Sequence, residues 1–206
     1  MKKRLIAVVV AVCALAVLAV GSTFAFFTSK DNAGNTFTMG NVKIELTETT
    51  DRTDDDIYTA EVKDDNKGIT YGNVLPNTEI SKKPIVTNTG ANDAWIRVQL
   101  DVTTDSENET MKANIAELKQ AIINDMVDNY GWAVKADDDG YIYYTSVLAP
   151  DAVANLFETV SIPKTWGNEA ADAGFSIEIS AQAVQSDNNG STWDTAEWLG
   201  FEDING

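Results

Sequence analysis

Apolar and polar residues alternate along much of the chain after residue 40. The clearest apolar stripes are Val42, Ile44 and Leu46; Ile96, Val98, Leu100 and Val102; and Phe175, Ile177 and Ile179. A period of two is typical of a strand that buries one face. Shorter strands are predicted at residues 57–63, 69–74, 84–89, 131–136 and 141–148, and Asp139-Gly140 predicts a hairpin between the last two. About eight strands separated by turn residues indicate a two-sheet β-sandwich rather than a βαβ fold.

One segment has helical periodicity instead. Its apolar positions are Met111, Ile115, Leu118, Ile122 and Met126. This spacing predicts an amphipathic helix at about 109–129, and packing on the sandwich is favoured over binding of a partner. Shorter helices are predicted at 153–157 and 192–199. Trp193 and Trp198 are expected to cover a sheet edge rather than to bind sugar.

The amino terminus has the order of a secretory signal peptide. Basic residues at 2–4 precede an unbroken apolar run at 5–20, and small residues follow up to Ala25. The run is somewhat shorter than the roughly 20 residues that span a bilayer. A cleaved signal at 1–25 is therefore favoured over a retained anchor, and we expect membrane contact only through the uncleaved signal.

Two cleavage positions fit the small-residue rule. Cleavage after Ala25 places Thr23 at the −3 position and leaves Phe26 as the new amino terminus. Cleavage after Gly21 places Ala19 at that position instead. The chemistry of the residues does not choose between the two positions.

Composition excludes several kinds of chemistry. The chain has 206 residues, with 15 basic and 32 acidic residues, no histidine, and a single cysteine, Cys13, inside the apolar run. The lack of histidine excludes Ser/His/Asp and Cys/His catalysis and histidine-bound zinc. The cleaved chain has no cysteine for disulfides. The net charge of −17 argues against nucleic acid and anionic membrane surfaces as partners.

Acidic clusters are the remaining candidates for a ligand site. The clusters are Asp54-Asp55-Asp56, Asp64-Asp65 and Asp137-Asp138-Asp139, and calcium prefers oxygen ligands of this kind. Asp137, Asp138 and Asp139 are the candidate residues. An EF-hand loop with Gly140 at its sixth position would have Lys135 at its first, where a carboxylate is required. Solvated turns are therefore favoured over a calcium site. We expect no cofactor, with calcium as the alternative.

Several segments in order along the chain carry a resemblance to a known family. They are Gly-Ser-Thr-Phe-Ala-Phe-Phe-Thr at 21–28, Asn-Thr-Phe-Thr-Met-Gly-Asn-Val at 35–42, and the segments 74–79, 88–90, 95–98, 140–144 and 181–185. Together they resemble the TasA/camelysin family of exported proteins. Asn77 departs from the family pattern, which usually has glycine in this turn.

The resemblance implies a jelly-roll-like β-sandwich exported from a Gram-positive bacterium. It also implies cleavage by a dedicated signal peptidase and a role in extracellular or spore-associated fibres. Camelysin members are catalogued as metallopeptidases. Here the lack of histidine counts against peptidase activity, because carboxylates alone suit hard ions better than zinc.

The segment 26–41 is predicted to be a donor strand, ahead of a sandwich domain at 42–206. Phe26, Phe27, Phe37 and Met39 are its candidate anchors. A strand that adds to the next subunit makes a head-to-tail contact, which generates a filament. The alternative is a local strand that packs on the chain's own sheet.

These expectations describe a secreted structural subunit of an extracellular biofilm matrix or of cell-surface fibres. Its partners would be further copies of itself and an accessory matrix protein. Acid or divalent cations should favour assembly, since the subunits repel one another. The alternatives are a camelysin-like secreted peptidase and a monomeric surface binding module or adhesin.

Overall fold

Two long strands form the centre of the fold. β8 (Ala94–Thr104) and β13 (Phe175–Gln185) pair antiparallel over all eleven residues, from Thr104 beside Phe175 to Ala94 beside Gln185. Both strands contain an apolar stripe identified in the sequence. The other strands of the first sheet extend from this pair.

The computed structural model describes residues 28–32, 35–38, 42–51, 58–62, 69–72, 74–104, 106–167 and 175–198. The predicted signal peptide, with Thr23 and Ala25, lies outside these residues. The predicted anchors Phe26, Phe27 and Met39 lie outside them as well.

The central pair belongs to a six-stranded sheet with the order β2-β1-β13-β8-β10-β9. The other four strands are β1 (Thr28–Asn32), β2 (Asn35–Thr38), β9 (Trp132–Val134) and β10 (Ile142–Tyr144). All neighbours in this sheet are antiparallel. The amino-terminal strands therefore extend the sheet on the β13 side, and the β9–β10 hairpin extends it on the β8 side.

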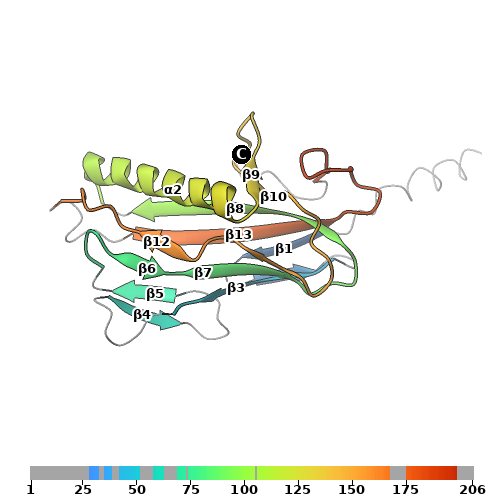
Figure 1. Cartoon of the computed structure of the whole chain (residues 1–206), viewed down its shortest axis with the longest axis horizontal. Helices are drawn as coiled ribbons and strands as arrows, with labels where there is room; N and C mark the ends of the chain where they lie inside the picture. The colour runs from blue at the N-terminus through green and yellow to red at the C-terminus, as the bar shows by residue number, and fades with distance from the viewer. Residues whose placement is uncertain are drawn as a thin grey trace, which may run out of the picture.

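A second layer lies opposite this sheet (Figure 1). It contains β3 (Ile44–Thr49), β7 (Lys83–Asn88) and β11 (Val153–Asn155) in the order β11-β7-β3, and β6 (Glu79–Ser81) paired with β12 (Thr159–Ser161). Backbone hydrogen bonds from Lys82 N to Glu158 O and from Leu156 N to Pro84 O join the two short ladders. β4 (Thr59–Val62) and β5 (Ile69–Gly72) form a further antiparallel hairpin.

The two layers enclose one main core. Alternate residues of β8, from Ala94 to Val102, are buried there with side chains of the second layer. Members from the other strands include Ile44, Leu46, Val86, Ile142, Val160, Ile179 and Ala181. Burial of each large apolar side chain contributes roughly 1.5–3 kcal/mol. The predicted two-sheet β-sandwich is confirmed.

The predicted helix is also confirmed, with its bounds. α2 (Glu109–Asn129) buries all five predicted apolar positions in the main core. The helix contacts β8 and β9, and Figure 1 shows it running alongside β8. β10 pairs with β8 at Arg97 and Val98. The helix thus lies beside the part of β8 that continues beyond this pairing.

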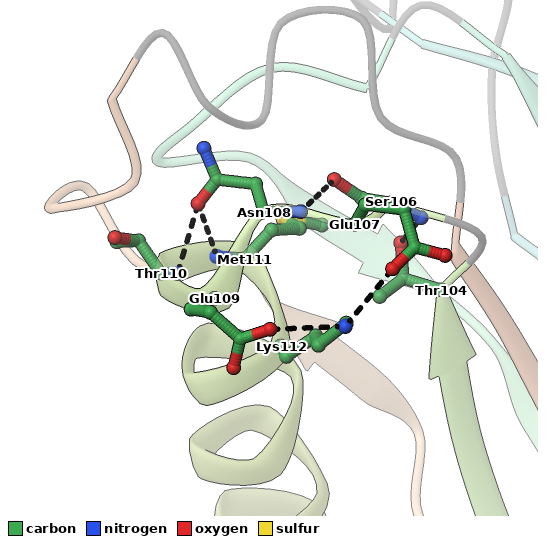
Figure 2. Close-up of polar contacts among 8 residues, drawn as sticks. All are labelled: Thr104, Ser106, Glu107, Asn108, Glu109, Thr110, Met111 and Lys112. Atoms are coloured by element: carbon green, nitrogen blue, oxygen red, sulfur yellow. Dashed lines mark hydrogen bonds and ion pairs between the residues drawn. The ribbon is translucent and has the colours of Figure 1, made fainter.

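Asn108 caps the amino-terminal end of α2 (Figure 2). Its backbone is extended, and its side-chain oxygen accepts hydrogen bonds from Thr110 N at 2.8 Å and Met111 N at 3.3 Å. These bonds satisfy two of the backbone donors that a helix leaves without partners in its first turn. Lys112 forms ion pairs with Glu109 on the first turn and with Glu107, which precedes the cap. The cap fixes where the chain leaves β8 and turns back along it.

Two smaller helix predictions are wrong. Residues 153–155 form the strand β11 instead of a helix. Val153 is β-branched, and the segment pairs with β7, which is far away in the sequence. The described part of 192–199 contains a hydrogen-bonded turn from Thr192 to Thr195 instead of a helix. The short strands β6 and β12 were not predicted, since three residues give no measurable alternation.

Two turn predictions are informative. β9 and β10 form the hairpin that Asp139-Gly140 indicated, but its loop is longer than two residues, with positive φ at Asp138 and Gly140. Asn77, which stands where the resembled family has glycine, adopts a φ of 65°. Asparagine tolerates this left-handed conformation better than most residues, so the turn forms without glycine.

We predict that Asn108→Ala lowers the free energy of unfolding by about 1 kcal/mol, because the first turn of α2 loses its side-chain acceptor. Urea denaturation of the chain from residue 26 onward measures the loss. Glu117→Ala, an exposed change in the middle of the same helix, is the control and should stay within about 0.5 kcal/mol of the parent. Equal effects of the two substitutions would contradict the assigned cap.

Candidate functional site

The predicted donor segment forms two strands of the chain's own sheet. β1 pairs with β13, from Thr28 beside Val184 to Asn32 beside Ser180, and β2 pairs with β1. This is the arrangement of the local-strand alternative. The candidate anchor Phe37 belongs to β2, where it lies beside Lys30. Donation of the segment to another subunit stays a prediction.

β1 occupies a defined part of the β13 edge. Its five residues lie beside residues 180–184, which form the half of β13 nearest to its carboxyl-terminal end. The other side of these same residues pairs with β8. An antiparallel backbone ladder supplies affinity, and register decides which side chains meet the core. The edge of β13 at 180–184 is therefore the candidate site for strand recognition.

A second cluster of functional groups lies on the outer face of the same sheet. Arg97 is 7% exposed, and its Nε donates a hydrogen bond to Gln182 Oε1 at 2.9 Å. Its guanidinium carbon lies 3.6 Å from the ring centre of Tyr141 and 4.4 Å from that of Trp198. A guanidinium between two aromatic faces gains cation–π attraction while its apolar faces are shielded from water.

Tyr143 extends this cluster toward the β9–β10 hairpin. Its hydroxyl donates a 2.5 Å hydrogen bond to Asp139 Oδ2, and its ring lies near Trp193, Trp198 and Lys135 Nζ. Burial, together with the hydrogen bond to the Asp139 carboxylate, raises the pKa of Tyr143 well above its usual value. The positive charge of Arg97 opposes this shift. The hydroxyl therefore stays protonated and serves as a donor.

Trp193 and Trp198 cover the face of the sheet rather than its edge. They pack against a small buried cluster of Trp95, Val184 and Ala196, on the side of the sheet that faces away from the main core. The expectation that they serve packing agrees with this position. The predicted edge location is wrong, because the chain folds back over the sheet after β13 ends.

The acidic triplet does not converge on one point. Asp137 and Asp138 are exposed, and Asp139 is half-buried. Asp139 accepts hydrogen bonds from the Tyr143 hydroxyl and from Tyr141 N, so its two oxygens already have protein donors. Within the described ranges, no group of three or more acidic or cysteine side chains is arranged to hold a metal ion.

A buried ion pair joins the strands of the second layer. Lys82 Nζ lies 2.7 Å from Glu48 Oε2, and the two side chains are 3% and 4% exposed. The neighbouring Ser81 Oγ accepts a hydrogen bond from Asp51 N, and Ser81 N donates to the hydroxyl of Tyr58. Ser81 and Lys82 therefore take part in separate structural contacts, which agrees with the argument that neighbours in a strand point to opposite faces.

Part of the outer-face cluster was accessible from the sequence. Alternation around Ile96 and Val98 places Trp95 and Arg97 on the same outward face, and alternation around Ile142 does the same for Tyr141 and Tyr143. No local pattern indicates that β10 pairs with this part of β8. No local pattern indicates that the residues after β13 cover the face either.

No helix among the described residues is long and apolar enough to cross a membrane. Comparison of the chain with protein-family models, with curated proteins and with solved structures finds no match.

We predict that Glu48→Ala lowers the free energy of unfolding by about 3–5 kcal/mol, because it leaves the Lys82 charge buried without its carboxylate. The double replacement Glu48→Leu with Lys82→Met should recover most of that loss, since it buries no charge. Urea denaturation of the three proteins gives the comparison. A loss below about 1 kcal/mol in Glu48→Ala would mean that the pair is solvated.

We predict that Tyr143→Phe costs about 1.5–3 kcal/mol at pH 7, since it removes a hydrogen bond to a carboxylate. The gap should narrow above about pH 10, by up to about 1.4 kcal/mol per pH unit. In this range the unfolded parent ionises Tyr143 while the folded parent keeps it protonated, so the parent loses stability that the phenylalanine variant does not lose.

Denaturation curves for parent and Tyr143→Phe at pH 7, 9, 10 and 11 measure the gap directly. Tyr144→Phe is the control, because Tyr144 contacts Trp132 in another part of the hairpin. A gap that stays constant across this pH range would show that Tyr143 ionises equally in both states.

Proposed function

We propose that the chain is a secreted structural subunit of extracellular matrix or surface fibres, and that it assembles head-to-tail by donating β1 to the next subunit. The observation that carries the proposal is the ladder between β1 and residues 180–184 of β13. A five-residue strand close to the amino terminus occupies a sheet position that the same strand of another copy could fill with identical pairing.

The position of β1 in the chain supports exchange. β1 pairs with β13 on one side and with β2 on the other. The pairs among β13, β8, β10 and β9 do not involve β1. We therefore expect the sandwich at 42–206 to keep its core while β1 moves from its own β13 to that of a neighbour.

The geometry of such a contact favours a filament. The donor side is β1 and the acceptor side is β13, so the two surfaces are different and the contact is heterologous. Each added subunit presents a new unfilled edge unless the ring closes. Phe26 and Phe27 directly precede β1 in the sequence, and in the fibre we expect them to contact the end of the neighbour's β13.

Two features of the sequence agree with this proposal. The segments at 21–28 and 35–42 resemble the TasA/camelysin family, whose members include fibre-forming exported proteins. The strongly acidic composition suits a subunit that stays soluble until charge is screened or neutralised. Cleavage after Ala25 would release β1 from the membrane, with a dedicated signal peptidase as the processing partner and an accessory matrix protein as a further partner.

We predict filaments from residues 26–206 and none from residues 40–206, because the shorter form lacks β1. Both are concentrated at pH 4 and pH 7, with and without calcium, and compared by size-exclusion chromatography and negative-stain electron microscopy. Compact monomers from both forms under every condition would contradict autonomous assembly.

A point variant separates loss of donation from loss of folding. Lys30→Pro places proline in the middle of β1, where it removes a backbone donor inside the sheet. Lys30→Ala is the matched control and keeps that donor. We expect filaments from Lys30→Ala alone, while both variants unfold cooperatively in urea, which shows that the sandwich at 42–206 is folded in each. Filaments of equal length from both variants would rule out β1 as the donor.

A further inference from the structure

The residues that follow β13 form a compact cover over the outer face of the sheet. We call residues 186–198 the C-terminal strap. Asn189 is 2% exposed, and its side-chain amide bonds both the backbone N and the backbone O of Glu197. Gly190 has a φ of 73°, and a Cβ there would come within 2.7 Å of Thr195 backbone atoms. The strap is therefore a closed loop with its own internal bonds.

Three contacts hold the strap on the sheet. Trp95 Nε1 donates a hydrogen bond to Asn189 O at 3.1 Å. Ala196 packs in the buried cluster with Trp95 and Val184. Trp198 covers one face of the Arg97 guanidinium, and Arg97 in turn bonds Gln182. The strap thus acts on β13 through two residues, Gln182 and Val184.

Gln182 and Val184 also pair with the first half of β1. Val184 lies between Trp95 on β8 and Thr28 on β1, and Gln182 lies in the same way between Arg97 and Lys30. Each set of three residues forms one rung across three strands. The strap contacts the β8 residue of both rungs, Trp95 and Arg97, and through them is joined to Val184 and Gln182 on β13. A motion of β13 that frees β1 at these positions therefore also disturbs the contacts beneath the strap.

We propose that the C-terminal strap is a lock that slows the release of β1, with Arg97 and Trp198 as its positioning residues. The inference rests on the proposed function, since it concerns control of the same exchange. The strap keeps Gln182 and Val184 in place beside β8. The edge of β13 that pairs with β1 is therefore fixed in position. Release of β1 is a local opening, and its frequency depends on how firmly the surrounding contacts are held.

The lock changes the rate of assembly and leaves the equilibrium between monomer and fibre unchanged. The two rungs are the same whether β1 comes from its own chain or from a neighbour, so the strap stabilises monomer and fibre equally. Loss of the strap contact makes the intermediate with a free β1 easier to reach. A weakened strap should therefore speed assembly without changing the concentration of monomer left at equilibrium.

Hydrogen exchange on monomers tests the lock without any fibre. In Trp198→Ala we expect backbone amides in residues 28–32 to exchange roughly tenfold faster, the factor that corresponds to loss of one shielded cation–π contact. Amides of α2 should be unchanged. Trp198→Phe keeps a ring over Arg97 and should restore most of the protection. Unchanged exchange at 28–32 in Trp198→Ala would overturn the lock.

Assembly kinetics supply the second readout. The lag before filaments appear should be roughly tenfold shorter in Trp198→Ala, with the same residual monomer concentration as the parent. Ile122→Val, which weakens the core at α2 far from the two rungs, is the control for general destabilisation. A residual monomer concentration that changes in Trp198→Ala, or a lag that does not, would overturn the lock.

The two readouts separate the lock from the proposed function. If no protein assembles, the fibre proposal fails, while exchange at residues 28–32 still decides whether the strap controls release of β1. If the parent assembles and Trp198→Ala matches it in both exchange and lag, the fibre proposal stands and the lock is wrong.

Discussion

The antiparallel pairing of β8 with β13 is the constraint on which the other features depend. It joins two segments that are far apart in the sequence, and it fixes their register over eleven residues. One face of the pair then belongs to the main core with the second layer and α2. The opposite face holds Arg97 against Gln182, and the edge of β13 holds β1. A shift of one residue would exchange the two faces and dismantle all three arrangements.

This constraint connects the proposed assembly site to the chemistry of the outer face. The residues of β13 that pair with β1 are held from the other side by β8, and from above by the strap. Charged and aromatic side chains, rather than a second apolar core, cover this outer face of the sheet. Aromatic rings and Gln182 contact the buried Arg97 guanidinium in place of the water that it loses.

The sequence predicted those elements whose hydrophobic periodicity is complete within one short segment. α2 has a full apolar stripe and a capping asparagine, so its bounds could be read from the sequence. Residues 153–155 could not, because Val153 joins a strand through pairing with Thr87, and nothing local distinguishes that from a helical turn. The 192–199 prediction failed because Asn189 and Thr195 bond backbone groups nearby and hold the chain in a loop.

The sequence could predict which residues of the candidate site share a strand face, but not how those residues come into contact. Alternation places Trp95 and Arg97 on one face of a strand, yet their contact with Trp198 depends on the chain folding back after β13. The segment 26–41 was identified as strand-forming, and β1 and β2 occur within it. Which edge it would join could not be known, since the edge exists only after β8 and β13 have paired.

Strand exchange is tested most directly by a disulfide between chains. Asn32 lies beside Ser180 in the β1–β13 register, and the Cα spacing of such pairs suits a disulfide. Residues 26–206 contain no cysteine, so Asn32→Cys and Ser180→Cys introduce the reacting thiols. The double variant in one chain, oxidised as a monomer, serves as the control that this geometry permits the bond.

The two single variants are then mixed, assembled and oxidised, and the products are separated without reductant. We predict a cross-linked pair of one Asn32→Cys chain and one Ser180→Cys chain in filaments, and very little of this product in unassembled monomer. Filaments without this cross-link, from chains whose double variant does close its own disulfide, would show that β1 stays on its own sheet and that the subunits associate by another surface.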